Sequence, residues 1–181
     1  IYKIIFELLI AFACFYTLRE NKIIGHRHVI DLSEKAGEAA LNAEGVLLPC
    51  SATVRLCNDD QIHCINREYR NIDSSTDVLS FPSVNWRYNM TAGKDEKRLK
   101  SEYDDVTGSY FLGDIIISVD HAKTQAEEYG HSYQREMAYL ITHSMFHLMG
   151  YDHMEDEERN NTNGVPTLIS TDDSKIKVYM I

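Results

Sequence analysis

Several features that would define a class of protein are missing from this chain of 181 residues. Its four cysteines include no C-x-x-C pair and are too sparse for a disulfide scaffold, so we expect reduced thiols and a cytoplasmic protein. The net charge of −10 argues against indiscriminate nucleic-acid binding through a basic surface, although it leaves room for a local basic groove. Internal repeats are absent, and the length suits one domain with a real core.

No apolar run in the sequence is long enough to cross a membrane. The longest unbroken run covers residues 8–16, whereas a spanning helix needs about 20 apolar residues. We interpret this run as part of a docked helix, with the apolar segment of a secretory signal as the alternative. A membrane is therefore not expected among the partners.

What the chain does contain is a histidine motif. His143, His147 and His153 follow the spacing H-x3-H-x5-H. On a helix, the first two share one face with Cβ atoms roughly 5–6 Å apart. Gly150 is suited to end that helix in the left-handed conformation, so that the chain turns back with the third histidine. Three neutral imidazoles leave one position of Zn²⁺ open, as in catalytic sites, so we predict one zinc ion per chain. Histidines that merely pack or cap are the alternative.

A zinc ion with an open position predicts hydrolysis, because it lowers the pKa of bound water to about 7 and polarises a carbonyl or phosphoryl oxygen. Metzincin peptidases share the histidine spacing but need Glu directly after the first His, where this chain has Ser144. Arg70 favours a phosphate, since a guanidinium binds phosphate bidentately. A surface salt bridge from Arg70 to Asp73 or Asp77 is the competing interpretation.

Two acidic residues near the motif have other expected roles. Asp152 either orients a neighbouring histidine or is simply solvated. Glu136 lies about two helical turns before His143, which is too far to bind the same ion, so we expect it in a structural ion pair. No residue stands out as a general base.

Hydrophobic periodicity predicts an α+β fold, a small mixed β-sheet of about four strands packed with helices in a single domain. Strands are expected at residues 21–32 (an edge strand), 52–57, 78–81, 112–119 (the most apolar, hence central) and weakly at 176–181. Helices are expected at 1–18, 34–44 after Ser33, 61–70 after Asn58, 120–129, 133–149 after Ser132, and 155–159. Residues 83–110 are polar and charged, and we expect a solvated loop, with a lid as the alternative.

The segment from His143 to His153 resembles the signature of the YbeY family of bacterial endoribonucleases. Four further segments carry the same resemblance and follow in family order: residues 66–70, 76–82, 112–118 and 125–132. The resemblance covers roughly residues 34–159. On this basis we divide the chain into an atypical N-terminal segment (1–32), a YbeY-like metal-dependent hydrolase domain (33–159) and an atypical C-terminal tail (160–181).

The resemblance implies a zinc-dependent, single-strand-specific endoribonuclease of the bacterial cytoplasm. It implies a role in ribosomal RNA processing, notably 3′-end maturation of the small-subunit RNA, and in ribosome quality control. The metal would lie on His143, His147 and His153, with Arg70 in the active-site groove, so Arg70 and His143 are the expected catalytic residues. Ser144 stands where many members have Gly, a small change that should leave the site intact.

Expected partners are single-stranded RNA, ribosomal RNA, the ribosome or its small subunit, and assembly factors. Two other functions compete with the nuclease. One is a non-catalytic binding module in ribosome assembly, with structural zinc. The lesser one is a metzincin-like metallopeptidase.

Overall fold

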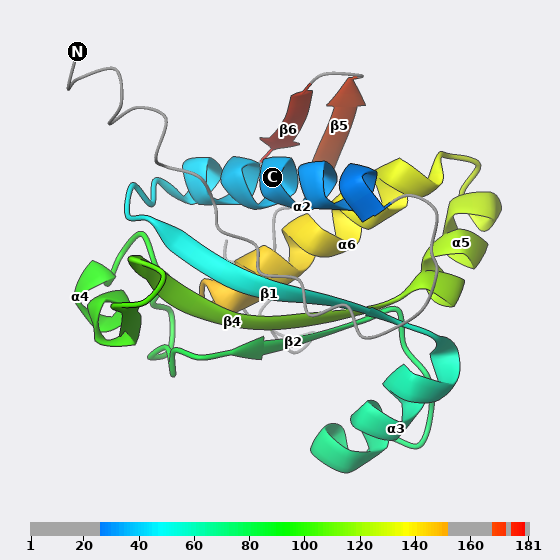
Figure 1. The fold of residues 1–181 in the computed structure, drawn as a ribbon, viewed down its shortest axis with the longest axis horizontal. Coiled ribbons are helices and arrows are strands. Elements are labelled where there is room, and N and C mark those ends of the chain that lie inside the picture. The colour runs from blue at the N-terminus through cyan, green and yellow to red at the C-terminus, as the bar shows by residue number, and fades with distance from the viewer. Residues whose placement is uncertain (1–25, 152–167, 173–174, 180–181) are drawn as a thin grey trace.

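The computed structural model describes residues 26–151, 168–172 and 175–179 (Figure 1). The helices predicted at 1–18 and 155–159, and His153 with them, lie outside the described residues. In chain order the elements are α2 (His26–Glu44), β1 (Cys50–Cys57), α3 (Asp59–Arg70), β2 (Val78–Pro82), α4 (Glu96–Leu99), the 3-10 turn η1 (Lys100–Glu102), β3 (Tyr103–Asp104), β4 (Ser109–Ser118), α5 (Val119–Glu128), α6 (Tyr133–Leu148), β5 (Leu168–Asp172) and β6 (Lys175–Tyr179).

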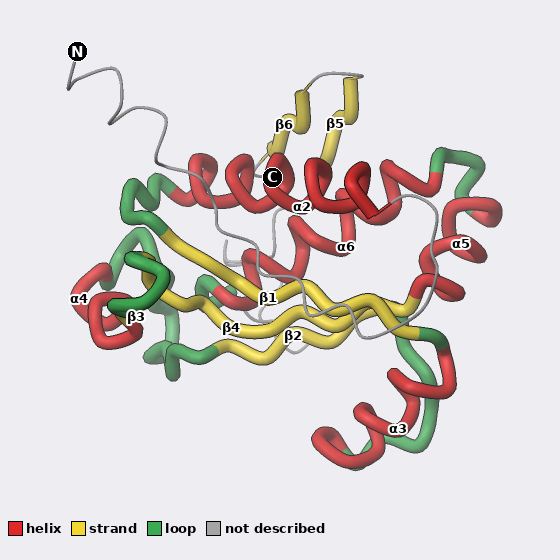
Figure 2. The backbone as a smooth tube through the Cα atoms, in the orientation of Figure 1, coloured by secondary structure: helices red, strands yellow, loops and turns green. Residues whose placement is uncertain are grey.

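A mixed four-stranded sheet organises the molecule, in the order β1-β4-β2 (Figure 2). β4 pairs in parallel with β1 and antiparallel with β2, while the short β3 pairs with the beginning of β4. The predicted fold class and the central place of the most apolar strand are both confirmed. β4 is central because its side chains are buried on both faces of the sheet.

The two faces of the sheet carry separate cores, and the alternation of side chains along β4 feeds both. Ile115 and Ile117 join the main core, where α6 contacts β2, β4 and α2. Ile116 joins a smaller core with Ile62 of α3 on the opposite face. Figure 1 shows α2 and α6 on one side of the sheet and α3 on the other. The main core therefore holds α6 firmly against the sheet.

The edge strand predicted at residues 21–32 is wrong over its described part, because residues 26–32 are the beginning of α2. Val29 and Leu32 pack on the main core from this helix. Ser33, predicted to be an N-cap, instead lies inside the helix with no exposed surface, and its hydroxyl donates to the carbonyl oxygen of Val29 (2.8 Å). That bond back along the helix satisfies a hydroxyl group that would otherwise favour a helix end.

The solvated loop predicted at residues 83–110 is also wrong. Val84, Ala92 and Leu99 of this segment are buried in the main core, at 4%, 0% and 0% exposure. The segment also forms α4, η1 and β3. These three residues lie eight and seven positions apart among charged neighbours, so neither the helical nor the strand period reveals them. We refer to residues 83–92 below as the wrapping segment.

At the other end of the described chain, β5 and β6 form an antiparallel hairpin. The strand character predicted around residues 176–181 is confirmed for the part within β6. Among the helices that the structure describes, none combines the length and the apolar character that crossing a membrane requires.

Candidate metal centre and active-site cleft

Helix α6 carries the first two histidines of the motif. Ser132 begins it as predicted, since its hydroxyl oxygen accepts the backbone N–H of Arg135 (3.2 Å). The predicted apolar stripe is confirmed by the burial of Met137, Leu140, Ile141 and Leu148. Because this stripe fixes the rotation of α6 about its axis, the face that bears the histidines is fixed too.

The C-terminal end of α6 is the turn that the sequence predicts. The N–H of Gly150 donates to the carbonyl oxygen of His147 (3.1 Å), and that of Tyr151 donates to the carbonyl oxygen of Phe146 (3.0 Å). The rings of Phe146 and Tyr151 contact each other at 5.3 Å between centroids. These are the two bonds and the apolar contact of a Schellman motif, and Gly150 has the left-handed φ of +100° that it needs.

The wrapping segment completes the same helix end. The indole N–H of Trp86 donates to the carbonyl oxygen of Leu148 (2.8 Å), and the N–H of Ala92 donates to that of Met149 (2.9 Å). When the two turn bonds are included, each of the four carbonyl groups from Phe146 to Met149 accepts a hydrogen bond. A Cβ atom at Gly150 would lie 2.6 Å from the carbonyl oxygen of Met90. Glycine is therefore required by close approach as well as by φ.

The two described histidines converge. Their Nε2 atoms lie 3.0 Å apart, with the ring centroids of His143 and His147 separated by 4.6 Å. Nδ1 of His147 lies 2.8 Å from the carbonyl oxygen of Tyr151, which only accepts, so Nδ1 donates and Nε2 keeps its lone pair. The ring of Tyr139 stacks on the ring of His143, with 5.8 Å between the two centroids.

This geometry fits a shared cation. Two nitrogen ligands at about 2.0–2.1 Å from a tetrahedral zinc ion lie roughly 3.3 Å apart, close to the 3.0 Å between the Nε2 atoms of His143 and His147. Such a spacing admits one shared proton or one shared cation. Within the part of the chain that the structure describes, no group of three or more His, Cys, Asp or Glu side chains is placed to hold a metal ion. The third ligand, His153, and the neighbouring Asp152 lie outside that part and stay predictions.

A cleft of about 630 Å³ opens beside the histidines. Three groups of residues line it. α6 contributes Tyr139, Leu140, His143 and His147, followed by Gly150 and Tyr151. The end of α3 contributes Arg70, and β2 with the residue before it contributes Asp77, Val78, Ser80 and Pro82. The wrapping segment contributes Val84 to Asn89 and Thr91. The cleft therefore brings the end of α3 and the histidines of α6 to one place, although Arg70 and His143 are 73 positions apart in the sequence.

Arg70 is exposed, and the structure does not support the alternative that it forms a salt bridge with Asp73 or Asp77. Asp73 instead pairs with His63 (2.8 Å) and Arg67 (3.9 Å). Asp77 accepts hydrogen bonds from the backbone N–H of Val78 (2.7 Å), the hydroxyl of Thr76 (3.1 Å) and the amide of Gln125 (3.1 Å). Among the described contacts, none joins Arg70 to either aspartate.

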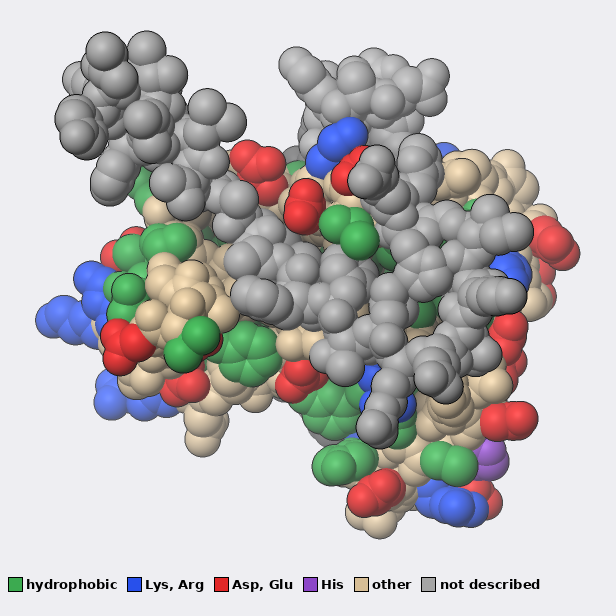
Figure 3. Space-filling model, viewed as in Figure 1, with side chains coloured by type: hydrophobic (Ala, Val, Ile, Leu, Met, Phe, Trp, Pro, Cys, Tyr) green, Lys and Arg blue, Asp and Glu red, His purple; other side chains and the backbone are tan. Residues whose placement is uncertain are grey.

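The charge of the cleft differs from that of the whole chain. Figure 3 shows acidic side chains scattered over the viewed face, consistent with the net charge of −10. The lining of the cleft instead carries Arg70 and Arg87 against the single carboxylate of Asp77, which already accepts three hydrogen bonds. This local excess of cationic groups favours an anionic ligand.

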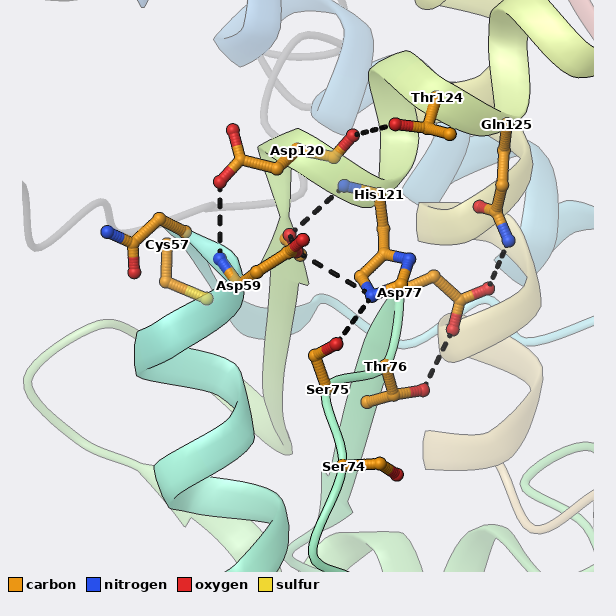
Figure 4. A network of polar contacts seen from close by, with 12 residues as sticks. Cys57, Asp59, Ser74, Ser75, Thr76, Asp77, Asp120, His121, Thr124 and Gln125 are labelled. Carbon is orange, nitrogen blue, oxygen red and sulfur yellow. Dashed lines mark hydrogen bonds and ion pairs between the residues drawn. The ribbon is translucent and has the colours of Figure 1, made fainter.

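A polar network missed by the sequence analysis fixes the wall that contains Asp77 (Figure 4). Nε2 of His121 lies 3.0 Å from the hydroxyl of Ser75 and 3.6 Å from a carboxylate oxygen of Asp59. Asp120 in turn accepts the backbone N–H of Asp59 (3.2 Å). The network joins the beginnings of α3 and α5 to the loop before β2, and its partners lie 46 and 61 positions apart, so no local pattern in the sequence reveals it.

A second missed group supports His147. The hydroxyl of Tyr151 donates to Oε2 of Glu44 (2.5 Å), and the backbone N–H of Gly93 donates to Oε1 of the same carboxylate (3.2 Å). Burial, together with Glu44, raises the pKa of the Tyr151 phenol. Glu44 thus ties α2 to the residue whose carbonyl group orients His147. The separation of 107 positions between Glu44 and Tyr151 leaves no local pattern to find.

Two further expectations concern side chains of α6. Oε2 of Glu136 lies 3.1 Å from Nε2 of His131, so the expected ion pair forms when His131 is protonated. Burial raises the pKa of Glu136, and His131 opposes that rise. Ser144, which stands where a metzincin has its catalytic Glu, is fully buried. A side chain at this position therefore points into the core, which argues against the peptidase.

A pair of helix-borne imidazoles beside a guanidinium in an open cleft is typical of hydrolases that act on phosphate esters with the help of a metal. The family model described as Endoribonuclease YbeY matches residues 16–169. The chain belongs to this family of hydrolytic nucleases.

Two relatives named Endoribonuclease YbeY agree with that assignment. The Endoribonuclease YbeY of Agathobacter rectalis is 49% identical over 133 residues, which span 69% of this chain and 78% of that protein. That of Lachnoclostridium phytofermentans is 48% identical over 122 residues, or 67% of this chain and 74% of that protein. The solution structure of TM1509 from Thermotoga maritima is 27% identical, with a TM-score of 0.45, and the match covers 76% of this chain and 74% of that one.

Proposed function

We propose that this protein is a zinc-dependent endoribonuclease that cleaves single-stranded RNA. The observation that carries the proposal is the 3.0 Å separation between the Nε2 atoms of His143 and His147, in the same cleft as Arg70. The family likeness supports ribosomal RNA as the substrate, with 3′-end maturation of the small-subunit RNA and ribosome quality control as the processes. The ribosome or its small subunit and assembly factors are the corresponding partners, in the bacterial cytoplasm.

His143, His147 and His153 would hold the ion. Zinc bound there would supply Lewis acidity towards a water molecule and a phosphoryl oxygen. The carbonyl group of Tyr151 holds His147 in the tautomer whose Nε2 is a ligand, and stacking on Tyr139 limits the orientations of His143. The protein thereby supplies a fixed pair of nitrogen ligands.

Arg70 binds the phosphate of the substrate. Its guanidinium is exposed to the cleft and is not occupied by Asp73 or Asp77, so its donors are available to two phosphate oxygens at once. As negative charge grows on those oxygens during cleavage, the same donors stabilise it. A cation in the same cleft as the ligand nitrogens therefore serves both binding and catalysis.

The experiment measures zinc content and cleavage of a defined single-stranded RNA in parallel. His143→Ala should lose zinc and slow cleavage by about 100-fold or more. Arg70→Ala should keep its zinc but slow cleavage by about 10- to 1000-fold. Arg67→Ala is the matched control, because Arg67 is exposed on the same helix, pairs with Asp73 and does not line the cleft. Unchanged cleavage by His143→Ala in metal-controlled buffer contradicts the proposal.

The same experiment separates the other functions. Zinc bound to wild-type protein without any turnover of RNA would favour the non-catalytic ribosome-assembly module. Cleavage of casein that a chelator blocks would favour the metallopeptidase.

A further inference from the structure

The tip of the wrapping segment is a tight turn held over the cleft. The N–H of Met90 donates to the carbonyl oxygen of Arg87 (2.9 Å), which closes a four-residue turn with Asn89 at a φ of +59°. Tyr88 and Asn89 occupy the two central positions and both line the cleft. A β-turn projects its central side chains outward, so this turn presents an aromatic ring and an amide to whatever enters.

The turn is attached to the same helix end that carries the histidines. On one side Trp86 donates to the carbonyl oxygen of Leu148, and on the other Ala92 donates to that of Met149. Between them, the carbonyl group of Met90 lies against Gly150. Arg98 also donates to the carbonyl oxygen of Asn85. With anchors before and after it, the turn keeps a set position relative to His147.

Tyr88 itself is unusual for a residue in a fixed turn. Its side chain is 72% exposed, although it lines the cleft beside Arg87. An aromatic ring exposed in this way offers a large flat apolar surface that a stacking partner would cover. The adjacent guanidinium of Arg87, together with that of Arg70 in the same cleft, favours a partner that is both flat and anionic.

We propose that Tyr88, with Arg87 beside it, is a base-stacking subsite for a nucleotide next to the phosphate that Arg70 binds. Every base has a π face, so stacking on one tyrosine grips single-stranded RNA without reading its sequence, while paired bases are hidden inside a duplex. The subsite deepens the proposed function and rests on it. It gives the cleft a physical reason to favour single strands.

The experiment measures the affinity of zinc-loaded protein for a cleavage-resistant single-stranded oligonucleotide with phosphorothioate linkages, by fluorescence anisotropy. Tyr88→Ala should raise Kd by roughly 5- to 100-fold. Tyr88→Phe keeps the ring and should stay within about 3-fold of wild type. Tyr103→Ala is the matched control, since Tyr103 is a 49% exposed tyrosine that does not line the cleft. Melting curves check that each variant is folded.

A second readout separates stacking from a general loss of shape. In wild-type protein, one abasic position along the oligonucleotide should weaken binding more than the others, and Tyr88→Ala should abolish that difference. The subsite is overturned if Tyr88→Ala weakens the binding of the intact strand and of every abasic strand equally, or if Tyr88→Ala leaves Kd unchanged.

The two proposals fail in different ways. If wild-type protein cleaves RNA and Tyr88→Ala binds the oligonucleotide as tightly as wild type does, only the subsite is refuted. Binding that depends on Tyr88 without any cleavage supports the subsite and refutes the nuclease. Absence of binding to single-stranded RNA by wild-type protein overturns both.

Discussion

Gly150 shows how much one residue decides in this molecule. It ends α6 with a left-handed backbone, and it leaves room for the carbonyl group of Met90 and the ring of Trp86. The sequence predicted the first role, because a glycine after a helical stripe is a local signal. It did not predict the second, because the wrapping segment that approaches Gly150 lies about 60 positions away.

Gly150→Ala should therefore cost about 2–5 kcal/mol of unfolding free energy, the sum of left-handed strain and a steric clash. Gly130→Ala is the matched control. Gly130 has a φ of +67° but nothing within 4 Å of an added Cβ, so its cost should be only about 1–2 kcal/mol. Urea unfolding measures both values. Equal costs at the two positions would mean that the wrapping segment does not press on Gly150.

The three cysteines in the part of the chain that the structure describes, Cys50, Cys57 and Cys64, should differ in reactivity. Burial raises the pKa of the Cys50 thiol to about 12 and that of Cys57 to about 11, whereas Cys64 is exposed. Since the thiolate is the reactive form, brief alkylation of folded protein at pH 7.5 should label Cys64 and spare the other two. Peptide mass spectrometry reads the sites, and protein unfolded in urea, where all three should react, is the control. Labelling of Cys50 in the folded protein would contradict the described core.

Glu136 predicts a dependence of stability on pH. Its folded pKa is raised above the ordinary 4.5, so the folded state holds the proton more tightly than the unfolded chain does. Its contribution to stability is therefore present in acid and is lost as pH rises from about 4.5 through the folded pKa. Glu136→Gln removes this loss, so its stability relative to wild type should improve between pH 4.5 and pH 7.5 in urea titrations. A relative stability that falls over this range would refute the raised pKa.

At the scale of whole elements, the local pattern predicted some parts well and others poorly. α6 was predicted because its apolar residues follow the helical period, and β4 because it contains the most apolar run of the chain. The beginning of α2 was missed because Val29 to Leu32 alternates weakly and Ser33 looks like a cap. The wrapping segment was missed because its buried apolar residues, Val84 and Ala92, depend on long-range packing rather than on any period.

Trp86 is the element-scale test of that packing. Trp86→Phe keeps an aromatic ring but leaves the carbonyl group of Leu148 without its donor, at a cost of about 1–3 kcal/mol. Because His147 lies in the same last turn, the variant should also bind zinc more weakly, which competition with a chromophoric chelator measures. Arg98→Lys, in α4 beyond the wrapping segment, should change zinc affinity less. If Trp86→Phe leaves the zinc affinity unchanged, the end of α6 keeps its conformation without the indole hydrogen bond.

At the scale of the whole molecule, the site is an assembly of three regions that meet at one cleft. His143 and His147 were predicted to lie together because four positions along a helix are neighbours whatever the fold. Arg70 joined them through family resemblance, and its place in the cleft is now described. Glu44, Trp86 and Tyr88 were not predicted, because only tertiary contacts bring them to the site. Local chemistry was readable from the sequence, whereas the surroundings that tune it were not.

X-ray absorption at the zinc edge, on protein whose metal content has been measured, tests the central claim most directly. One zinc ion per chain with a coordination shell of three imidazole nitrogens and one light atom is the predicted result. Single replacement of His143, His147 or His153 by alanine should each remove most of the metal. A shell that contains sulfur, or an ion that stays bound when His143 and His147 are both replaced, would contradict the account.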